Sequence, residues 1–245
     1  MAALKQPTAP AFYKRHLCSV GETQTIMVTA TGSTIVICLA ACAVLIVCEY
    51  RGWKRGKVLL KILASTAFLA LALQLDATAS VYGQLILVGL GLGWVGDVLL
   101  LSQKSRLFLL GLASFLLAHV AYAMAFASLP IASTALAVAF AVMSCLGIAV
   151  IAWLWSYLKA FHRAAVMAYV TAIIAMCALA IAISAASGTW QLAAAAVMFA
   201  ISGIAVARNR FVAPGASNKL WGLPLYYVAQ IILASSVSGV QASAG

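Results

Sequence analysis

One carboxylate in this sequence could do chemistry inside a membrane. The chain has four acidic residues, which are Glu22, Glu49, Asp76 and Asp97. Asp97 alone has apolar sequence of membrane-spanning length on both sides. An ionisable side chain at bilayer depth is costly, so it marks a candidate functional site. Acid–base chemistry by carboxylates therefore has very few places to occur in this chain.

The glycines before Asp97 match a nucleotide-binding pattern, but their context argues against that function. Gly91, Gly93 and Gly96 spell Gly-x-Gly-x-x-Gly. The fingerprint requires a preceding strand and a following helix in a soluble unit, whereas these glycines lie inside an apolar span. Gly89 and Gly93 instead form a small-xxx-small pair, which lets two helices approach closely. Asp97 follows Gly93 by one turn, so the same face would carry the carboxylate into a bundle.

A second helix face could supply partners for Asp97. The residues that recur on it at helical spacing are Gly111, Phe115, His119, Tyr122 and Phe126. His119 is either a hydrogen-bonded core residue or a catalytic group, and Tyr122 lies one turn away. We predict catalytic roles for Asp97, His119 and Tyr122.

Several other polar residues inside the apolar sequence could contact a substrate. Lys61 has three open roles: it could extend to the headgroups, bind a lipid phosphate or pair with Asp97. The tyrosines near span ends could also be ordinary interfacial aromatics. The predicted substrate-binding residues are Lys61, Tyr169, Ser202, Tyr226, Tyr227 and Gln230. We expect no cofactor and no metal ion, because Asp97 and His119 lack a third ligand and the six cysteines form no Cys-x-x-Cys pair.

The composition defines the class of protein. Of 245 residues, 66% are hydrophobic and 8% are charged, whereas a soluble domain would carry about 25% charged residues. The mean hydropathy is +1.11. The net charge of +11 lies in short loops between apolar runs rather than in one basic patch. These features indicate an integral membrane protein and no nucleic-acid partner.

Apolar runs of span length predict the architecture. A bilayer core needs about 20 apolar residues per helix. We predict an all-α, polytopic membrane bundle of eight transmembrane helices over residues 25–245, preceded by a polar N-terminal tail over 1–24. The expected spans are 25–48, 58–75, 82–101, 107–128, 131–157, 164–186, 190–207 and 220–238. Short connections favour an up-and-down bundle in which most helices pack against their sequence neighbours.

Basic residues alternate between the loops and so predict the orientation. The first, third, fifth and seventh loops hold 11 of the 15 lysines and arginines, and the second, fourth and sixth hold none. Basic loops stay in the cytoplasm. We therefore expect a multi-pass protein, in the inner membrane if the source is bacterial, with both termini outside. Asp97 would lie near the cytoplasmic end, in a polar pocket that opens to that side.

Two successive motifs resemble those of the YhhN-like family. They run Gly89-Leu90-x-Leu92-x-x-x-Gly96-Asp97 and Phe108-x-x-Gly111-Leu112-x-x-Phe115-x-x-x-His119-x-x-Tyr122-x-x-x-Phe126. Further matches are Lys61 (followed by Ile62 instead of proline), Val166-x-x-Tyr169 with Met176, and Leu223-Pro224-Leu225-Tyr226-Tyr227-x-Ala229-Gln230 with Ser236. The resemblance covers residues 55–238. The family consists of eight-helix membrane proteins that include the lysoplasmalogenases.

The resemblance implies hydrolysis of the vinyl ether bond of lysoplasmalogens to a fatty aldehyde and a glycerophospho-base. Two aspartates are implied as catalytic groups, and Asp97 matches the first. The second is missing, because the family's Ser-Asp reads Ser202-Gly203 here, before Arg210-Phe211. Gly93 also stands where a serine is usual.

Three functions follow as hypotheses. The first is a lysoplasmalogenase-type hydrolase with Asp97 as general acid, His119 or Tyr122 assisting and Lys61 holding the phosphate. The second is a catalytically silent relative that still binds lysolipids, since Gly203 replaces the second aspartate. The third is a small transporter that uses Asp97 as a proton or ion site. The expected partners are a lysophospholipid substrate and membrane lipids, and the sequence leaves homo-oligomerisation open.

Overall fold

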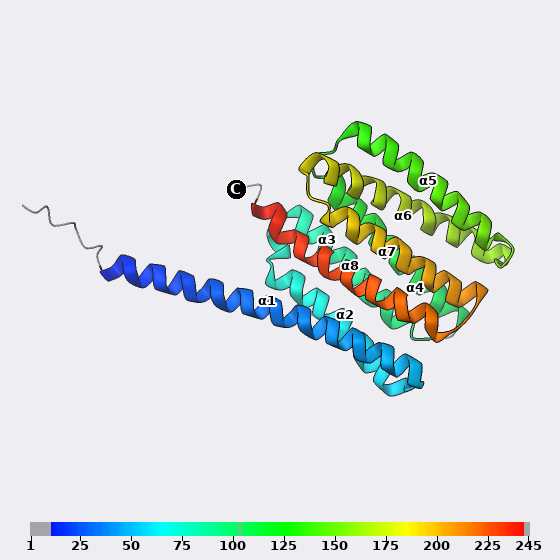
Figure 1. The fold of residues 1–245 in the computed structure, drawn as a ribbon, viewed down its shortest axis with the longest axis horizontal. Coiled ribbons are helices and arrows are strands. Elements are labelled where there is room, and N and C mark those ends of the chain that lie inside the picture. Colours follow the sequence, from blue (N-terminus) through cyan, green and yellow to red (C-terminus); the bar gives the residue numbers. More distant parts are fainter. Residues whose placement is uncertain (1–10, 103, 243–245) are drawn as a thin grey trace, which may run out of the picture.

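The computed structural model describes residues 11–102 and 104–242, and all regular elements in these ranges are helical. Eight long helices account for most of this part of the chain (Figure 1). Their bounds are α1 Ala11–Arg51, α2 Lys54–Gln74, α3 Val81–Leu99, α4 Ser105–Ala127, α5 Ser133–Trp155, α6 Ala160–Ser187, α7 Gln191–Ala207 and α8 Ala216–Ala242. Two short segments complete the list, a 3₁₀ turn at Ala77–Ala79 and a π-helical turn at Arg208–Val212.

Each of the eight helices contains a stretch that is long and apolar enough to cross a membrane. The predicted all-α bundle of eight transmembrane helices is therefore confirmed, and the protein is an integral, multi-pass membrane protein. Several helix bounds differ from the expected ones by a few residues, as at the connection between the last two helices. The last helix begins at Ala216 rather than at 220, and the seventh span continues through the π-helical turn to Val212.

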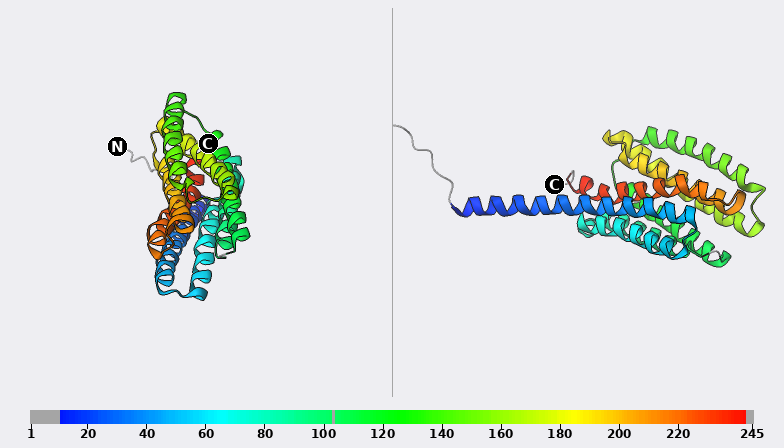
Figure 2. Two further views of the ribbon diagram at one scale, coloured as in Figure 1. Left: turned by 90° about the vertical axis from the view of Figure 1, so that its right-hand side faces the viewer. Right: turned by 60° about the horizontal axis from the view of Figure 1, so that its bottom comes forward.

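The polar N-terminal segment is helical from Ala11 onward. Residues 1–10 lie outside the described part, but α1 already begins at Ala11 and continues without a break into the membrane span at Val28. The first part of α1 projects beyond the other helices, at the end of the bundle where α8 finishes (Figures 1 and 2). Residues from 11 to 24 therefore extend the first transmembrane helix.

Helix α8 lies at the centre of the arrangement and contacts α1, α2, α3 and α7. Most helices also pack on their sequence neighbours, as expected, but α4 packs on α6 instead of on α5. Helix α5 is peripheral and buries only Ala139, Gly147 and Leu154. It approaches α6 at Gly147, where an added Cβ would lie 2.7 Å from Ile174 and 3.0 Å from Val170.

The glycines of α3 let this helix pack deep in the bundle. A Cβ built on Gly89 would overlap the Tyr122 ring of α4, and one on Gly96 would lie 2.6 Å from the Phe115 ring. A Cβ on Gly93 would meet the Gln230 amide of α8 at 2.7 Å. Gly91 has nothing within 4 Å of its Cβ position. The predicted close-packing face is confirmed, and it ends at Asp97.

The four basic connections gather at one end of the bundle. The α1–α2, α3–α4, α5–α6 and α7–α8 connections all lie at the right-hand end in Figure 1. The topology therefore separates a basic end from an end whose connections carry no lysine or arginine. Asp97 lies two residues before the end of α3, which places it toward the basic end.

Candidate active site

Asp97 is buried, with 3% of its surface exposed, and it accepts two hydrogen bonds and forms one ion pair with side chains from two other helices. The Lys61 Nζ of α2 lies 3.2 Å from Asp97 Oδ1. The Ser65 hydroxyl, one turn further along α2, donates to Asp97 Oδ2 at 2.5 Å, and the Tyr226 hydroxyl of α8 donates to the same oxygen at 2.8 Å. A buried charge persists only when it is paired and hydrogen-bonded. Helices α2, α3 and α8 are thus held together around one carboxylate.

A chain of hydrogen bonds continues from this carboxylate into the core. The Gln230 amide donates to the Tyr226 oxygen at 3.1 Å, and the Tyr122 hydroxyl donates to Gln230 Oε1 at 2.9 Å. The Tyr227 hydroxyl lies 3.4 Å from the Ser65 hydroxyl on the other side. Buried polar networks of this kind fix the orientation of their members. Tyr226 is therefore held in place before any substrate binds.

A cavity of about 220 Å³ reaches Asp97 from the basic end of the bundle. Helices α5, α6 and α7 contribute mostly apolar walls. The apolar lining on these helices includes Val150, Leu154, Val166, Val170, Ile173 and Phe199. The charged residues that line the same cavity are Glu49, Lys57, Lys61, Asp97, Arg210 and Lys219. The cavity therefore has an apolar side and a polar, basic mouth.

Five of the nine predicted site residues line this cavity. They are Asp97, Lys61, Tyr169, Ser202 and Tyr226. The Ser202 hydroxyl is already engaged, because it donates to the Phe199 carbonyl of its own helix at 2.7 Å. Three roles were open for Lys61, and in the structure it is paired with Asp97.

The other four predicted residues, His119, Tyr122, Tyr227 and Gln230, lie behind the cavity wall. Tyr122 and Gln230 reach Asp97 only through Tyr226. Tyr227 contacts Ser65 and the Lys61 carbonyl. These residues can act on the chemistry by positioning other groups.

His119 is fully buried and sits against two aromatic rings. Its ring centroid lies 4.5 Å from that of Phe199 and 5.1 Å from that of Tyr169, and both of these rings line the cavity. Its Nδ1 lies 2.5 Å from the Phe115 carbonyl oxygen. Its Nε2 has no hydrogen-bond partner among the described residues. The histidine thus supports the wall of the cavity from outside.

Gly203 lines the cavity at the position where the family resemblance implies a second aspartate. A Cβ at this position would lie 3.4 Å from the Tyr169 hydroxyl and 3.8 Å from Ile173. These are ordinary contact distances, so the backbone leaves room for the first atom of a side chain. An aspartate at 203 would begin beside Tyr169, facing the cavity.

Comparison with known proteins identifies the family. A model of the YhhN family matches residues 56–237. The chain belongs to the YhhN family. Neither curated proteins nor solved structures give a match to it.

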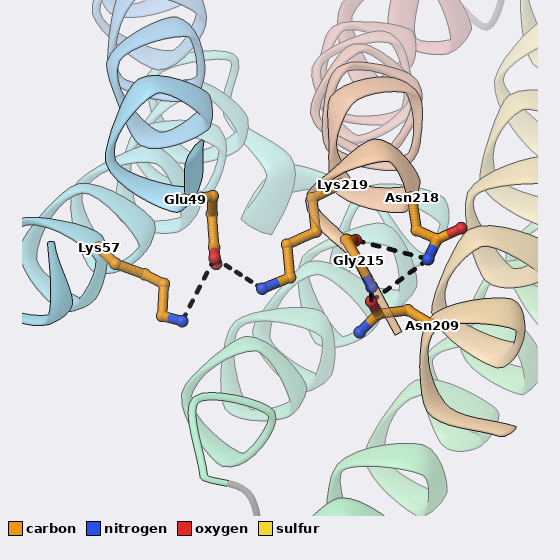
Figure 3. A network of polar contacts seen from close by, with 6 residues as sticks. All are labelled: Glu49, Lys57, Asn209, Gly215, Asn218 and Lys219. Carbon is orange, nitrogen blue, oxygen red and sulfur yellow. Dashed lines mark hydrogen bonds and ion pairs between the residues drawn. The ribbon is translucent and has the colours of Figure 1, made fainter. Parts of the chain in front are cut away.

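The YhhN match includes every predicted site residue, but it leaves out the whole of α1. Helix α1 nevertheless supplies Glu49, whose Oε2 accepts from Lys57 Nζ at 3.3 Å and from Lys219 Nζ at 2.6 Å. Figure 3 shows this carboxylate between the two lysines. No pattern in the sequence indicated this group, because Lys219 lies 170 positions from Glu49 along the chain.

Two further features of the site were missed. Ser65 follows Lys61 by one helical turn, so the spacing could have suggested that both face Asp97. The α7–α8 turn is fixed by Asn218, whose amide donates to the Ala213 carbonyl at 2.7 Å. The same amide donates to Asn209 Oδ1 at 3.3 Å, a bond that Figure 3 shows. Asn218 is buried, and it ties the first turn of α8, which carries Lys219, to the α7–α8 connection.

No three histidine, cysteine, aspartate or glutamate side chains of the described part lie close enough together to hold a metal ion. The five cysteines that the structure describes are free thiols. The groups at the cavity that can exchange protons include the Asp97 carboxylate with its partner Lys61, the Glu49 carboxylate, and the hydroxyls of Tyr169 and Tyr226.

Proposed function

We propose that this YhhN protein hydrolyses the vinyl ether bond of a lysoplasmalogen to a fatty aldehyde and a glycerophospho-base. One observation carries the proposal: Asp97 lies on a cavity that has apolar walls on one side and a basic mouth on the other. A lysolipid combines a hydrocarbon chain with an anionic phosphate, so both parts find matching surfaces. The family resemblance implies the same substrate class.

The reaction needs a proton at carbon. The proton adds to the vinyl carbon remote from the ether oxygen, and the π electrons form the new C–H bond. The other vinyl carbon becomes an oxocarbenium ion, which water captures with loss of a proton. The resulting hemiacetal collapses to the aldehyde and the free glycerol hydroxyl. A positioned carboxylic acid is a suitable proton donor for the first step.

Asp97 would serve as that donor and then as the counter-charge. Its Oδ2 accepts two hydroxyl donors, whereas its Oδ1 is contacted by Lys61. We assign Oδ1 as the atom that takes a proton from Lys61 and passes it to the vinyl carbon. The neutral Lys61 amine would then accept the proton that the captured water loses. The carboxylate that remains would stabilise the oxocarbenium ion, because a preorganised charge is most effective where water is excluded.

Tyr226 and the residues behind it would position the carboxylate. Tyr226 lines the cavity and touches Asp97 directly, while Gln230 and Tyr122 orient its hydroxyl. His119 would hold the aromatic wall formed by Phe199 and Tyr169. In this scheme Tyr122 and His119 are positioning residues.

The cavity would open to the cytoplasm. Lysine and arginine concentrate in the four connections at its mouth end, and basic loops are retained on the cytoplasmic side. In a bacterium the protein would lie in the inner membrane.

Gly203 favours a second candidate function. The carboxylate that would activate water is absent from the cavity wall at this position, and loss of one of two cooperating groups costs orders of magnitude in rate. The protein would then bind lysolipids without cleaving them.

Aldehyde release from a lysoplasmalogen, measured with purified protein and with a Gly203→Asp variant, separates the two candidates. Turnover by the natural chain supports the hydrolase. Turnover that begins only in Gly203→Asp supports the silent lipid-binding relative. No aldehyde from either protein, with binding of lysolipid absent as well, excludes both.

A further inference from the structure

The mouth of the cavity carries more positive than negative charge. Glu49 and Asp97 are the two carboxylates among its described lining residues, against four basic side chains. Lys61 is paired with Asp97 deep in the cavity. At the mouth, Lys57 and Lys219 share the single oxygen Glu49 Oε2. One carboxylate neutralises one lysine, so the mouth retains an excess positive charge.

The basic side chains at the mouth are held in place. Lys219 is 31% exposed and Lys57 is 24% exposed, and the bond to Glu49 fixes the position of each ammonium group (Figure 3). The Arg210 guanidinium lies over the Phe108 ring at 4.5 Å, and it donates to the Ser105 hydroxyl at 3.3 Å. Lys219 and Arg210 both line the cavity. Such fixed donors suit recognition of an oxyanion.

We propose that Lys219 and Arg210 form a phosphate subsite, which binds the phosphate diester of a lysophospholipid while its chain enters the apolar part of the cavity. Lys57 shares the Glu49 carboxylate with Lys219, so it adds to the positive potential at the mouth. We assign phosphate binding to the residues at the mouth and not to Lys61, because Lys61 is paired with Asp97. The identity of the lipid as a vinyl ether rests on the proposed function, whereas the phosphate subsite does not.

The surroundings favour a lipid as the source of the phosphate. The mouth lies at the basic end of a transmembrane bundle, at the level where headgroups are found. The same cavity continues between the apolar walls of α5, α6 and α7. Free phosphate would use the basic residues but would leave these walls without a ligand.

The test is an equilibrium binding measurement that needs no turnover. The probe is a labelled 1-alkyl lysophospholipid, whose saturated ether cannot be hydrolysed as a vinyl ether, bound to purified protein in a neutral detergent. A 1-alkylglycerol of the same chain length lacks the phosphate and is the ligand control. Lys104→Gln is the variant control, because Lys104 is exposed at the same end of the bundle and does not line the cavity.

The subsite predicts opposite effects of two substitutions. Lys219→Gln removes one charge-assisted contact and should weaken lysophospholipid binding about tenfold, with Lys219→Arg retaining it. Glu49→Gln keeps a side chain of the same size whose amide oxygen can still accept from the lysines, but it removes the competing negative charge, so it should tighten binding. Neither change should affect the alkylglycerol, and Lys104→Gln should change neither ligand.

Several results would overturn the subsite. If the ion pairs of Glu49 with Lys57 and Lys219 only stabilise the fold, Lys219→Gln and Glu49→Gln should both weaken binding, and for both ligands. Equal affinity of wild-type protein for the lysophospholipid and the alkylglycerol would show that the phosphate does not contribute to binding. Inorganic phosphate that binds as tightly as the lysophospholipid would exclude a lipid source. Intact lysophospholipid binding without aldehyde release would refute the hydrolase and leave the subsite supported.

Discussion

Adding one methyl group to Gly89 tests whether the glycine face of α3 sets the position of Asp97. A Cβ at Gly89 would lie 2.6 Å from Cδ1 and 2.8 Å from Cζ of Tyr122. Tyr122 is fully buried, and its hydroxyl is bonded to Gln230, so the ring cannot move away without breaking the chain to Asp97. Overpacking of this kind costs about 1–3 kcal/mol. The higher helix propensity of alanine returns part of that, about 1 kcal/mol at most.

Because the overlap with the Tyr122 ring is severe, the packing cost should lie in the upper part of this range, about 2–3 kcal/mol, and Gly89→Ala should lower stability by about 1–2 kcal/mol net. For a chain of this size the corresponding fall in Tm is about 2–8 °C, measured by thermal unfolding of purified protein in detergent. The matched control is Gly91→Ala, since nothing lies within 4 Å of a Cβ at that position. This variant should leave Tm unchanged or raise it slightly.

Equal Tm values for Gly89→Ala and wild type would refute the reasoning, as would a larger loss in Gly91→Ala.

Two further predictions concern the groups around the carboxylate. Lys61→Met should destabilise the protein by about 3–5 kcal/mol, because it leaves Asp97 buried without its partner. Lys61→Met combined with Asp97→Asn should recover a large part of this loss. Additive losses of the two single variants, measured by thermal unfolding, would show that the two residues do not interact. Tyr226→Phe removes a hydrogen bond to a charged acceptor, worth about 1.5–3 kcal/mol, and should lower kcat for aldehyde release roughly tenfold to a hundredfold. An unchanged kcat in Tyr226→Phe would exclude the contact with Asp97 from the reaction.

The fold could be predicted because it depends on local sequence. Apolar runs of span length are separated by basic or small polar loops, and a membrane allows few structures for such runs other than helices. The spacing of Gly89 and Gly93 also predicted that Asp97 faces the bundle, since helix geometry fixes which residues share a face. The continuous helix from Ala11 was missed because its sequence is polar and span length was the criterion.

The residue types of the site could be predicted, but not which of the residues line the cavity and which lie behind its wall. Asp97, Lys61 and Tyr226 were all named as candidate site residues, with pairing to Asp97 one of three roles left open for Lys61, and the structure brings the three into contact. The place of His119 could not be predicted, because the rings between it and the cavity come from α6 and α7. Those contacts depend on α4 packing on α6, and no local pattern specifies that pairing.

The contacts of Glu49 are a clearer case of contacts between helices that no local sequence pattern specifies. Its partners lie on α2 and α8, and the second is 170 residues away. The sequence indicated basic loops but not that two of them share one carboxylate beside a cavity. Charge contacts between distant helix ends depend on how the helices tilt, so only the structure reveals them.

Aldehyde release from a lysoplasmalogen by wild-type protein and by Asp97→Asn is the decisive comparison. We expect aldehyde from the wild type and a loss of at least about 10²-fold in Asp97→Asn, as is typical when a general acid is removed. Equal rates from the two proteins, or no aldehyde from the wild type, would contradict the assignment of Asp97 as the proton donor.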